Sequence, residues 1–296
     1  MRPLREDGDD MGRLKKIIKK IIRSCMYTVK EPVYVPLLKG SFLEGRTVLI
    51  TGGSGGIGSA IAKTCVDNGA DVIICGRNPA KLETMKDEIL QHKSTACIYS
   101  YRLDITAVDS FAVQLEEMAQ LVPNKRIDVL INNAGLDAGG MIPETSEKQY
   151  DQTVETNLKG TYFLTQAFAN YLLSHGIRGN ILNVSSASGN RPVVTPYMYS
   201  KWAITGLTKG LAKRLIGRGI VVNGIAPGPT ATQMLGLDGS NLHHPGSPAK
   251  RYADPNEIAN LAVFLVSDMG RMIVGETIYI TGGVGTLSFD DIDYEL

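Results

Sequence analysis

The 296-residue sequence has little of several features that mark particular classes of protein. Its four cysteines show neither a Cys-x-x-Cys pair nor metal-ligand spacing, so we expect reduced thiols in a cytoplasmic protein and no metal site. No apolar run approaches the roughly 18 residues of a membrane-spanning helix, and no secretory signal is expected at the acidic N-terminus. The formal net charge of +1 provides no overall attraction for nucleic acid.

What the sequence does contain is a regular alternation of β-rich runs and longer helical patterns from Arg46 onward. This alternation is typical of a parallel sheet with helices on both faces, and 43% hydrophobic residues suffice for a large core. We therefore predict an α/β fold, a single doubly wound Rossmann-type domain. The strand runs are RTVLI, DVIICG, CIYSYRLD, IDVLINNAG, GNILNVSS, GIVVNGIAPG and GETIYITGG, and the helical segments are 57–68, 79–92, 106–121, 147–175, 197–217 and 255–267.

The N-terminal part of the chain has a different pattern. We divide the chain into an extension at 1–40, with a proline-containing linker, and a dinucleotide-binding catalytic domain at 41–296. Within 12–26, leucine and isoleucine recur at helical spacing and lysines fill the opposite face, which predicts a basic amphipathic helix. Such a helix suits peripheral contact with an anionic membrane surface, or docking on its own domain or on a second subunit. The pattern leaves both alternatives open.

A glycine-rich turn separates the first strand run from the first helical segment, in TVLITGGSGGIGSAIAK. Gly52 suits a tight turn, Gly56 lets the backbone approach a pyrophosphate, and Gly58 lets the helix pack on the strand. The phosphates would lie at the positive helix N-terminus. The strand before the turn and the helix after it favour a dinucleotide site over a simple turn without ligand.

The end of the second strand run bears on the choice of cofactor. The sequence there is ICGRN, so Gly76 occupies the position at which an acid would hold the ribose hydroxyls, and Arg77 follows. An arginine suits a 2′-phosphate through charge-assisted hydrogen bonds, which favours NADP(H) over NAD(H). The alternative is a solvated arginine.

Seven short motifs follow one another in a familiar order between about residues 44 and 285. With them the chain resembles the short-chain dehydrogenase/reductase family, in its compact, ketoreductase-like single-domain branch. Each motif alone would be a weak signal, whereas seven in order are specific. They are TGGSGGIG at 51–58, LD at 103–104, NNAG at 132–135, ETNL at 155–158, NVSSASG at 183–189, YMYSK at 197–201 and APGPTAT at 226–232.

Two tyrosines compete for the role of catalytic acid in the segment PYMYSKWAI. Tyr197 and Lys201 are four residues apart and share one helix face, whereas Tyr199 points to roughly the opposite side. A neighbouring ammonium would lower the pKa of a phenol, which is ordinarily about 10. We therefore predict that Tyr197 is the proton donor and acceptor, and that Tyr199 packs or lines the cleft.

Other catalytic roles are implied by the resemblance. Ser186 matches the serine that hydrogen-bonds the reacting oxygen, and Ser185 should point away because neighbouring strand residues alternate faces. Asn157 matches the asparagine that holds a water beside the lysine. Ser186 and Tyr197 are separated by eleven positions, about two fewer than is common in the family, which predicts a tighter loop between them.

The resemblance also implies a set of cofactor contacts and a substrate flap. Asp104 would lie at the adenine, and the segment 230–250 would cover the substrate. His243, His244 and Arg191 are candidates for a polar or anionic substrate group, or are solvated. The predicted cofactor-binding residues are Gly52, Ser54, Gly55, Gly56, Ile57, Gly58, Arg77, Asn78, Asp104, Ile105, Asn133, Ala134, Gly135, Tyr197, Lys201, Pro227, Gly228 and Thr230.

We thus predict an oxidoreductase that moves a hydride between NADP(H) and a carbonyl or secondary alcohol. The expected assembly is a homodimer or homotetramer through the helices at 147–175 and 197–217. The expected location is the cytoplasm, with the inner membrane surface as an alternative. The rival hypotheses are a non-catalytic nucleotide-binding scaffold, which has no need of the acid, and a sugar epimerase or dehydratase, whose glycine spacing differs.

Overall fold

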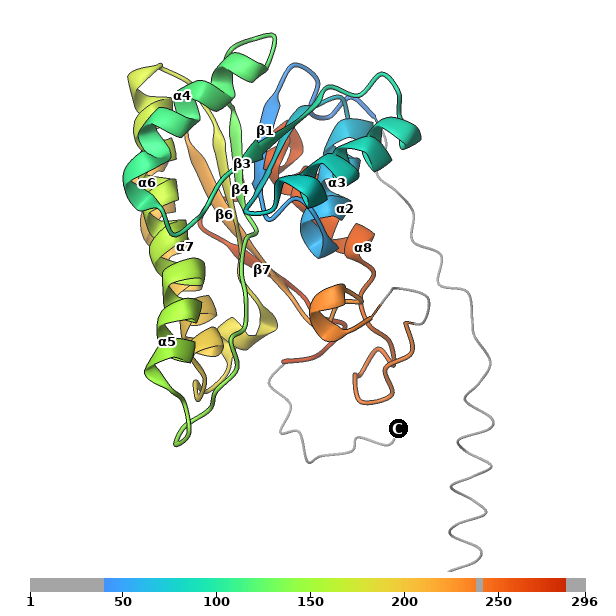
Figure 1. Ribbon diagram of the computed structural model, residues 1–296, viewed down its shortest axis with the longest axis vertical. Helices are drawn as coiled ribbons and strands as arrows, with labels where there is room; N and C mark the ends of the chain where they lie inside the picture. Colours follow the sequence, from blue (N-terminus) through green and yellow to red (C-terminus); the bar gives the residue numbers. More distant parts are fainter. Residues whose placement is uncertain (1–39, 238–241, 286–296) are drawn as a thin grey trace, which may run out of the picture. The chain divides into compact units, whose positions relative to one another are not determined.

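The computed structural model describes residues 40–237 and 242–285, and the features below refer to them (Figure 1). The amphipathic helix predicted within 12–26 lies outside the described residues, so that interpretation stays a prediction. No helix among the described residues is both long and apolar enough to cross a membrane.

Seven parallel strands form one sheet in the order β3-β2-β1-β4-β5-β6-β7. β1 lies inside the sheet, β2 and β3 follow it toward one edge, and β4 to β7 continue from the other side of β1 toward the opposite edge. The carboxyl ends of β1 and β4 therefore face a crevice, which is where α/β sheets bind their ligands. The strands are β1 Thr47–Thr51, β2 Asp71–Gly76, β3 Ile98–Arg102, β4 Val129–Asn132, β5 Asn180–Val184, β6 Val221–Pro227 and β7 Thr277–Ile280.

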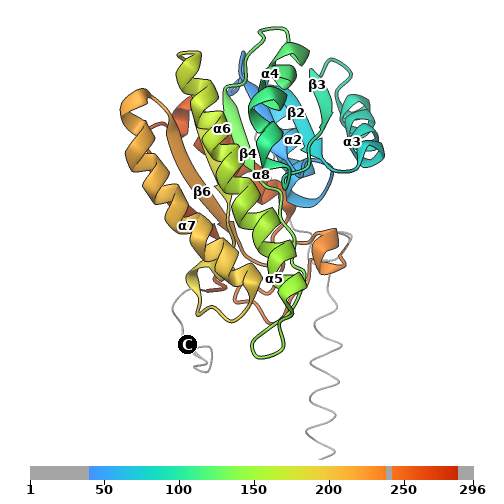
Figure 2. The ribbon, with the colours of Figure 1, turned by 60° about the vertical axis from the view of Figure 1, so that its left-hand side comes forward.

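Helices cover both faces of this sheet (Figures 1 and 2). One buried cluster joins the sheet to α2, α3 and α8, and a second joins the other face to α4, α6 and α7. The predicted doubly wound fold is thereby confirmed. The helices are α2 Gly56–Asp67, α3 Pro79–His92, α4 Phe111–Leu121, α5 Glu147–Val154, α6 Thr161–Ser174, α7 Pro196–Leu215 and α8 Pro255–Val266.

Local sequence signals fix where the helices begin. Thr195 accepts a hydrogen bond from the backbone N–H of Met198, and Pro196 occupies the first turn, so α7 starts immediately before Tyr197. α5 and α8 each begin with a reciprocal capping box. The short helical turns are η1 Val108–Ser110, η3 Ala187–Asn190, η4 Ile216–Arg218, η5 Gln233–Leu235 and η6 Asp268–Gly270.

The helix predicted over 147–175 contains a change of winding. Between α5 and α6 the chain forms a π-helical turn, η2 Glu155–Gly160, instead of continuing as α-helix. A side chain at Gly160 would overlap the carbonyl oxygen of Ile105, so the glycine lets this turn pack against the segment that follows β3. The wider turn is the physical difference from the prediction.

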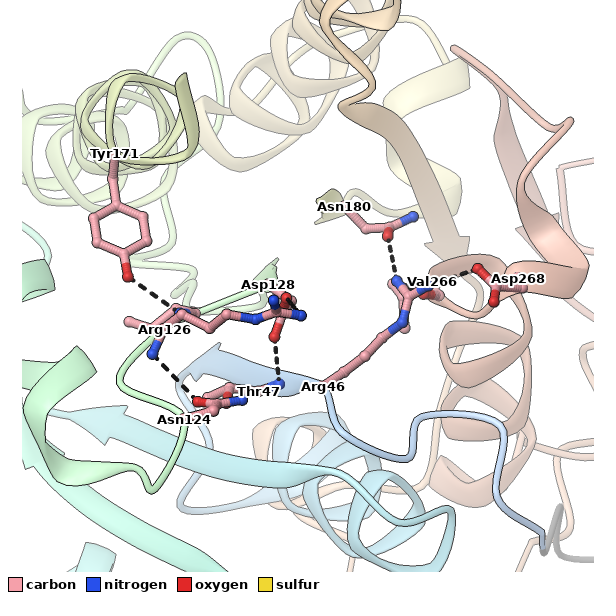
Figure 3. Close-up of polar contacts among 10 residues, drawn as sticks. Arg46, Thr47, Asn124, Arg126, Asp128, Tyr171, Asn180, Val266 and Asp268 are labelled. Atoms are coloured by element: carbon pink, nitrogen blue, oxygen red, sulfur yellow. Dashed lines mark hydrogen bonds and ion pairs between the residues drawn. The ribbon is translucent and has the colours of Figure 1, made fainter. Parts of the chain in front are cut away.

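At the amino ends of the strands, polar side chains bond one another (Figure 3). The carboxylate of Asp128 accepts from the backbone N–H of Thr47 at 2.9 Å and lies 2.7 Å from the guanidinium of Arg126. Arg46 donates to Asn180 at 3.1 Å and pairs with Asp268 at 2.6 Å. These bonds tie the starts of β1, β4 and β5 together.

Candidate active site

The glycine turn after β1 has the geometry that a phosphate-binding turn requires. Gly52 and Gly56 have φ values of +66° and +56°, which favour glycine. A Cβ at Gly58 would overlap the carbonyl oxygen of Gly52, so only glycine permits this approach of α2 to β1. Gly55 provides no side-chain cap, and the first turn of α2 has no acidic residue. The positive end of α2 is therefore presented to an anion, which fits a pyrophosphate.

A hydrogen-bonded clamp holds the turn against the end of β4. The hydroxyl of Thr51 accepts from the backbone N–H groups of Asn133 and Ala134, each at 3.0 Å. The side-chain amide of Asn133 donates to the carbonyls of Thr51 and Gly52 at 2.9 and 3.1 Å. Asn133 and Ala134 were predicted as cofactor contacts. Thr51 was not, although its position between a strand and the first glycine is a usable signal.

The adenosine side of the predicted site lies at the ends of β2 and β3. Arg77 is exposed, and the side chain of Asn78 accepts from the backbone N–H of Lys81, which makes Asn78 the N-cap of α3. The carboxylate of Asp104 accepts from the backbone and hydroxyl of Thr106 at 3.0 and 2.8 Å. These hydrogen bonds, with smaller contributions from nearby arginines, lower the pKa of Asp104. The carboxylate is thus held ionised and oriented.

Two predicted cofactor contacts are largely occupied in packing. Ile57 packs against the core on the α2 face, and Ile105 is buried in the cluster on the other face. Ser54, Gly55 and Gly56 line a cavity of about 930 Å³ that extends between α2 and α3. Of the predicted site, this cavity borders only the glycine turn, since neither the predicted adenosine contacts nor Tyr197 and Lys201 line it.

α7 places Tyr197 and Lys201 on one face, one turn apart. The ammonium of Lys201 lies 5.7 Å from the centre of the Tyr197 ring, and it donates to the carbonyl of Val184 at 2.9 Å. Ser186, which follows β5, lies close enough to the phenol of Tyr197 to lower its pKa by hydrogen bonding. Tyr199 is exposed. The tyrosine, the lysine and the serine at the end of β5 therefore meet at one point.

The pKa values differ from the sequence-based argument. Burial raises the pKa of Tyr197 above its ordinary value; the hydrogen bond from Ser186 lowers it, the Asp137 carboxylate raises it, and the net direction is upward. Burial also lowers the pKa of Lys201 to about 8. Lys201 does not offset the rise, because its ammonium is not among the groups that lower the pKa of the phenol. The expected direction of the Tyr197 pKa shift was therefore wrong.

The π turn positions Asn157 beside the lysine. Its side-chain amide pairs with the backbone of Leu136, accepting from the N–H and donating to the carbonyl, both at 2.8 Å, and it donates to Ser200 at 3.1 Å. A Cβ at Gly135 would lie 3.4 Å from both the Asn157 oxygen and the Lys201 nitrogen. Gly135, Asn157 and Lys201 therefore enclose one small polar space. Ser200, beside Lys201 in sequence, was not predicted.

The serine pair after β5 divides as expected from alternation. Ser185 is buried, with its hydroxyl bonded to the carbonyl of Lys201 at 2.9 Å and to Thr205 at 3.0 Å. Ser186 is half-buried and accepts from the N–H of Ser188 at 3.1 Å. Of the eleven positions after Ser186 up to and including Tyr197, the first four form the helical turn η3. Ser186 thus faces the cleft while Ser185 anchors α7.

The remaining predicted residues lie at the end of β6 and in the flap. Pro227 ends β6, and Gly228 packs so closely on Thr281 that an added Cβ would lie 2.8 Å from the Thr281 Cα. Thr230 is buried, and its hydroxyl donates to the carbonyl of Gly228 at 2.9 Å. Within the described ranges no group of three or more His, Cys, Asp or Glu could hold a metal ion.

Three candidates for substrate contact have separate environments. His244 stacks on Tyr252, with ring centres 4.4 Å apart, so this histidine braces the flap. His243 is exposed, and its backbone forms an isolated antiparallel β-bridge with that of Arg251. The guanidinium of Arg191 lies within about 4 Å of where a Cβ of Gly285 would be. None of these contacts brings the three side chains together.

Comparisons with known proteins agree with this geometry. The family model of the short chain dehydrogenases matches residues 46–242. A 3-oxoacyl-(acyl-carrier-protein) reductase of Thermotoga maritima is 34% identical and a gluconate 5-dehydrogenase of Gluconobacter oxydans 32% identical; each alignment covers 82% of this chain, and 98% and 95% of the relatives. A short chain dehydrogenase of Burkholderia cenocepacia, solved in complex with NADP, has a TM-score of 0.73 at 30% identity, with 82% of this chain and 99% of that chain covered.

Together the matched length, the identities and the shared fold leave one assignment. The enzyme class follows from the same matches, since these relatives are named as dehydrogenases or reductases. The chain belongs to the short-chain dehydrogenase/reductase family and is an NAD(P)-dependent oxidoreductase.

Proposed function

We propose that the protein reduces a carbonyl compound to a secondary alcohol with NADPH, using Tyr197 as the general acid. The observation that carries this proposal is the meeting of Tyr197, Ser186 and Lys201 beside the glycine turn. A binding module has no use for a phenol held between a hydroxyl and an ammonium. A non-catalytic scaffold is therefore the weaker hypothesis.

The residues of the chain divide the work around the substrate oxygen. NADPH, held at the glycine turn and the ends of β2 and β4, would supply the hydride for the substrate carbon when bound. Tyr197 gives its phenolic proton to the oxygen, and Ser186 donates a hydrogen bond that stabilises the developing negative charge. Lys201 and Asn157 line the polar space through which a proton returns to the phenolate.

The protonation of Tyr197 bears on how the rate in each direction should depend on pH. Because burial raises its pKa, the side chain is a protonated phenol at neutral pH, which is the form that reduction consumes. Alcohol oxidation needs the phenolate and should increase with rising pH. We therefore expect the rate of alcohol oxidation, relative to that of carbonyl reduction, to be lower at neutral pH than at alkaline pH.

Arg77 supports NADPH as the cofactor. The guanidinium is exposed directly after β2, and Gly76 places no carboxylate beside it that would repel a 2′-phosphate. The Burkholderia cenocepacia relative is described in complex with NADP.

We also propose a cytoplasmic homodimer or homotetramer that pairs through α6 and α7, and a small-molecule substrate.

The test combines dinucleotide binding with a panel of ketones and 3-oxoacyl thioesters. Tyr197→Phe should reduce carbonyl turnover by about 10²–10⁴-fold or more, because general acid catalysis contributes that much. NADPH affinity should stay within a few-fold. Tyr199→Phe is the matched control, since it removes an exposed hydroxyl two residues away, and its turnover should equal wild type.

Two results would contradict the proposal. Equal turnover in Tyr197→Phe and Tyr199→Phe would remove Tyr197 from the chemistry. Tight NADPH binding with no turnover on any carbonyl of the panel would favour the scaffold. Sedimentation of the full chain at several concentrations tests the assembly separately.

A further inference from the structure

β2 ends at Gly76, which has no side chain, whereas the paired residue at the end of β3 is Arg102. Gly76 ends β2, and a Cβ there would lie 3.6 Å from Leu82 of α3 and 3.8 Å from the hydroxyl of Ser54 in the glycine turn. Position 76 therefore faces the glycine turn, on the α3 side of the sheet. The absent side chain leaves room beside Ser54.

Arg102 is the register partner of Gly76. The two Cα atoms are paired in the parallel ladder of β2 and β3, about 5 Å apart by strand spacing. Along β3, Ile98 packs with the α3-side cluster and the hydroxyl of Ser100 bonds to Glu83 of α3. Since side chains alternate, Arg102 lies on this same face, beside the space left by Gly76.

Among the described residues, no carboxylate pairs with the guanidinium of Arg102, which leaves it available to bind an anion. Arg102 is exposed, and within the described residues neither Arg102 nor Arg77 has a carboxylate within ion-pair distance. Glu83 is engaged by Ser100 and by Lys86 at 3.2 Å. The charges of Arg77 and Arg102 both lower the pKa of Asp104, so both arginines lie in the neighbourhood of this one carboxylate.

We propose that Arg102 is a second specificity-determining arginine, which binds the 2′-phosphate of NADP(H) across Gly76 from the side opposite Arg77. This inference rests on the proposed function. Two planar guanidinium groups would share a dianionic phosphate, one from the loop after β2 and one from the end of β3. The glycine is then as necessary as the arginines, because any larger side chain fills the shared space.

The test measures dinucleotide affinity of the full chain by nicotinamide fluorescence, without substrate. Arg102→Met should weaken NADPH binding about tenfold or more, as expected for loss of a charge-assisted hydrogen bond, and should change NADH affinity less than about twofold. Arg102→Lys keeps the positive charge but loses the planar, bidentate guanidinium, so its NADPH affinity should lie between those of wild type and Arg102→Met. Arg214→Met, an exposed arginine in the last turn of α7, is the matched control and should bind both dinucleotides as wild type does.

Gly76→Asp is an independent test. The position has contacts of ordinary van der Waals length and no positive φ, so the fold tolerates a side chain there. The new carboxylate should weaken NADPH binding about tenfold or more and leave or tighten NADH binding. Adenosine 2′,5′-bisphosphate should compete better than adenosine 5′-monophosphate in wild type, and this advantage should shrink in Arg102→Met.

The outcomes separate the inference from the proposed function. Equal losses for NADPH and NADH in Arg102→Met, or no loss for either, would overturn the role of Arg102 while Arg77→Met still reports on the proposed cofactor. Failure of wild type to bind either dinucleotide would overturn the proposed function itself.

Discussion

At the amino ends of the strands, polar side chains bond to one another in ion pairs and buried hydrogen bonds, whereas the carboxyl ends bring together a glycine turn, a buried lysine and the candidate catalytic side chains. The amino edge joins Asp128 to Thr47 and Arg126, and Arg46 to Asn180, through bonds of 2.7–3.1 Å (Figure 3). The carboxyl edge instead presents the turn of Gly52 and the buried ammonium of Lys201. The same sheet ends in two chemically different surfaces.

The difference separates stability from function. Bonds among the protein's own groups at the amino edge contribute to folding and leave nothing for a ligand. At the carboxyl edge, an uncapped helix start and a desolvated lysine cost stability and gain binding or chemistry, as expected for ligand sites of α/β sheets. Substitutions at the two edges should therefore separate ligand affinity from the free energy of unfolding.

The largest effect is expected at the glycine turn. Gly58→Ala places a methyl group against the carbonyl oxygen of Gly52 and 2.5 Å from the amide nitrogen of Asn133, so α2 must move away from β1. We expect dinucleotide affinity to fall by about 100-fold or more, measured by fluorescence titration. Gly210→Ala, where the added Cβ meets nothing within 4 Å, should bind normally. Normal affinity in Gly58→Ala would show that the turn does not hold the phosphates.

At the amino edge we expect a smaller effect, on the free energy of unfolding and not on dinucleotide affinity. Asp128→Ala leaves the buried backbone N–H of Thr47 without its acceptor and removes the ion-pair partner of the exposed Arg126. The free energy of unfolding should fall by about 2–3 kcal/mol in urea titrations, with dinucleotide affinity unchanged. Asp268→Ala removes an exposed partner of Arg46 and should cost less than about 1 kcal/mol. A large loss of affinity in Asp128→Ala would break the separation between the edges.

The smallest effect concerns Lys201 and pH. Burial lowers its pKa to about 8, below the value of 10.5 in the unfolded chain, so between these values the unfolded state binds more protons. Stability from this group is therefore gained as pH rises through 8. Relative to Lys201→Met, wild type should gain about 1 kcal/mol between pH 8 and 9, measured as the difference in unfolding free energy. A constant difference would mean that the lysine is not desolvated.

Much of the fold was predictable because its signals are local. The strand runs and the glycine spacing each depend on a few adjacent residues, and the four-residue step between Tyr197 and Lys201 fixes their common face. The Tyr197 pKa was not predictable in direction, because burial depends on how distant segments pack.

Contacts between distant segments were also invisible in the sequence. Asn157 pairs with Leu136 from 21 positions away, and Thr51 accepts from Asn133 across 82 positions. The π turn depends on the approach of Ile105 to Gly160, which no local pattern encodes. Sequence motifs thus identified candidate residues, while their neighbours came from the structure.

The π turn of 155–160 makes the site sensitive to how this segment winds. Its hydrogen bonds span five residues in place of four, so the side chains of α5 and α6 are out of phase by about one position relative to a continuous α-helix. Regular α-helical winding of the same residues would rotate α5 by about 100° relative to α6, which would carry Asn157 away from Leu136. A substitution that favours regular winding there would therefore misalign the cleft even where every side chain that lines it is unchanged.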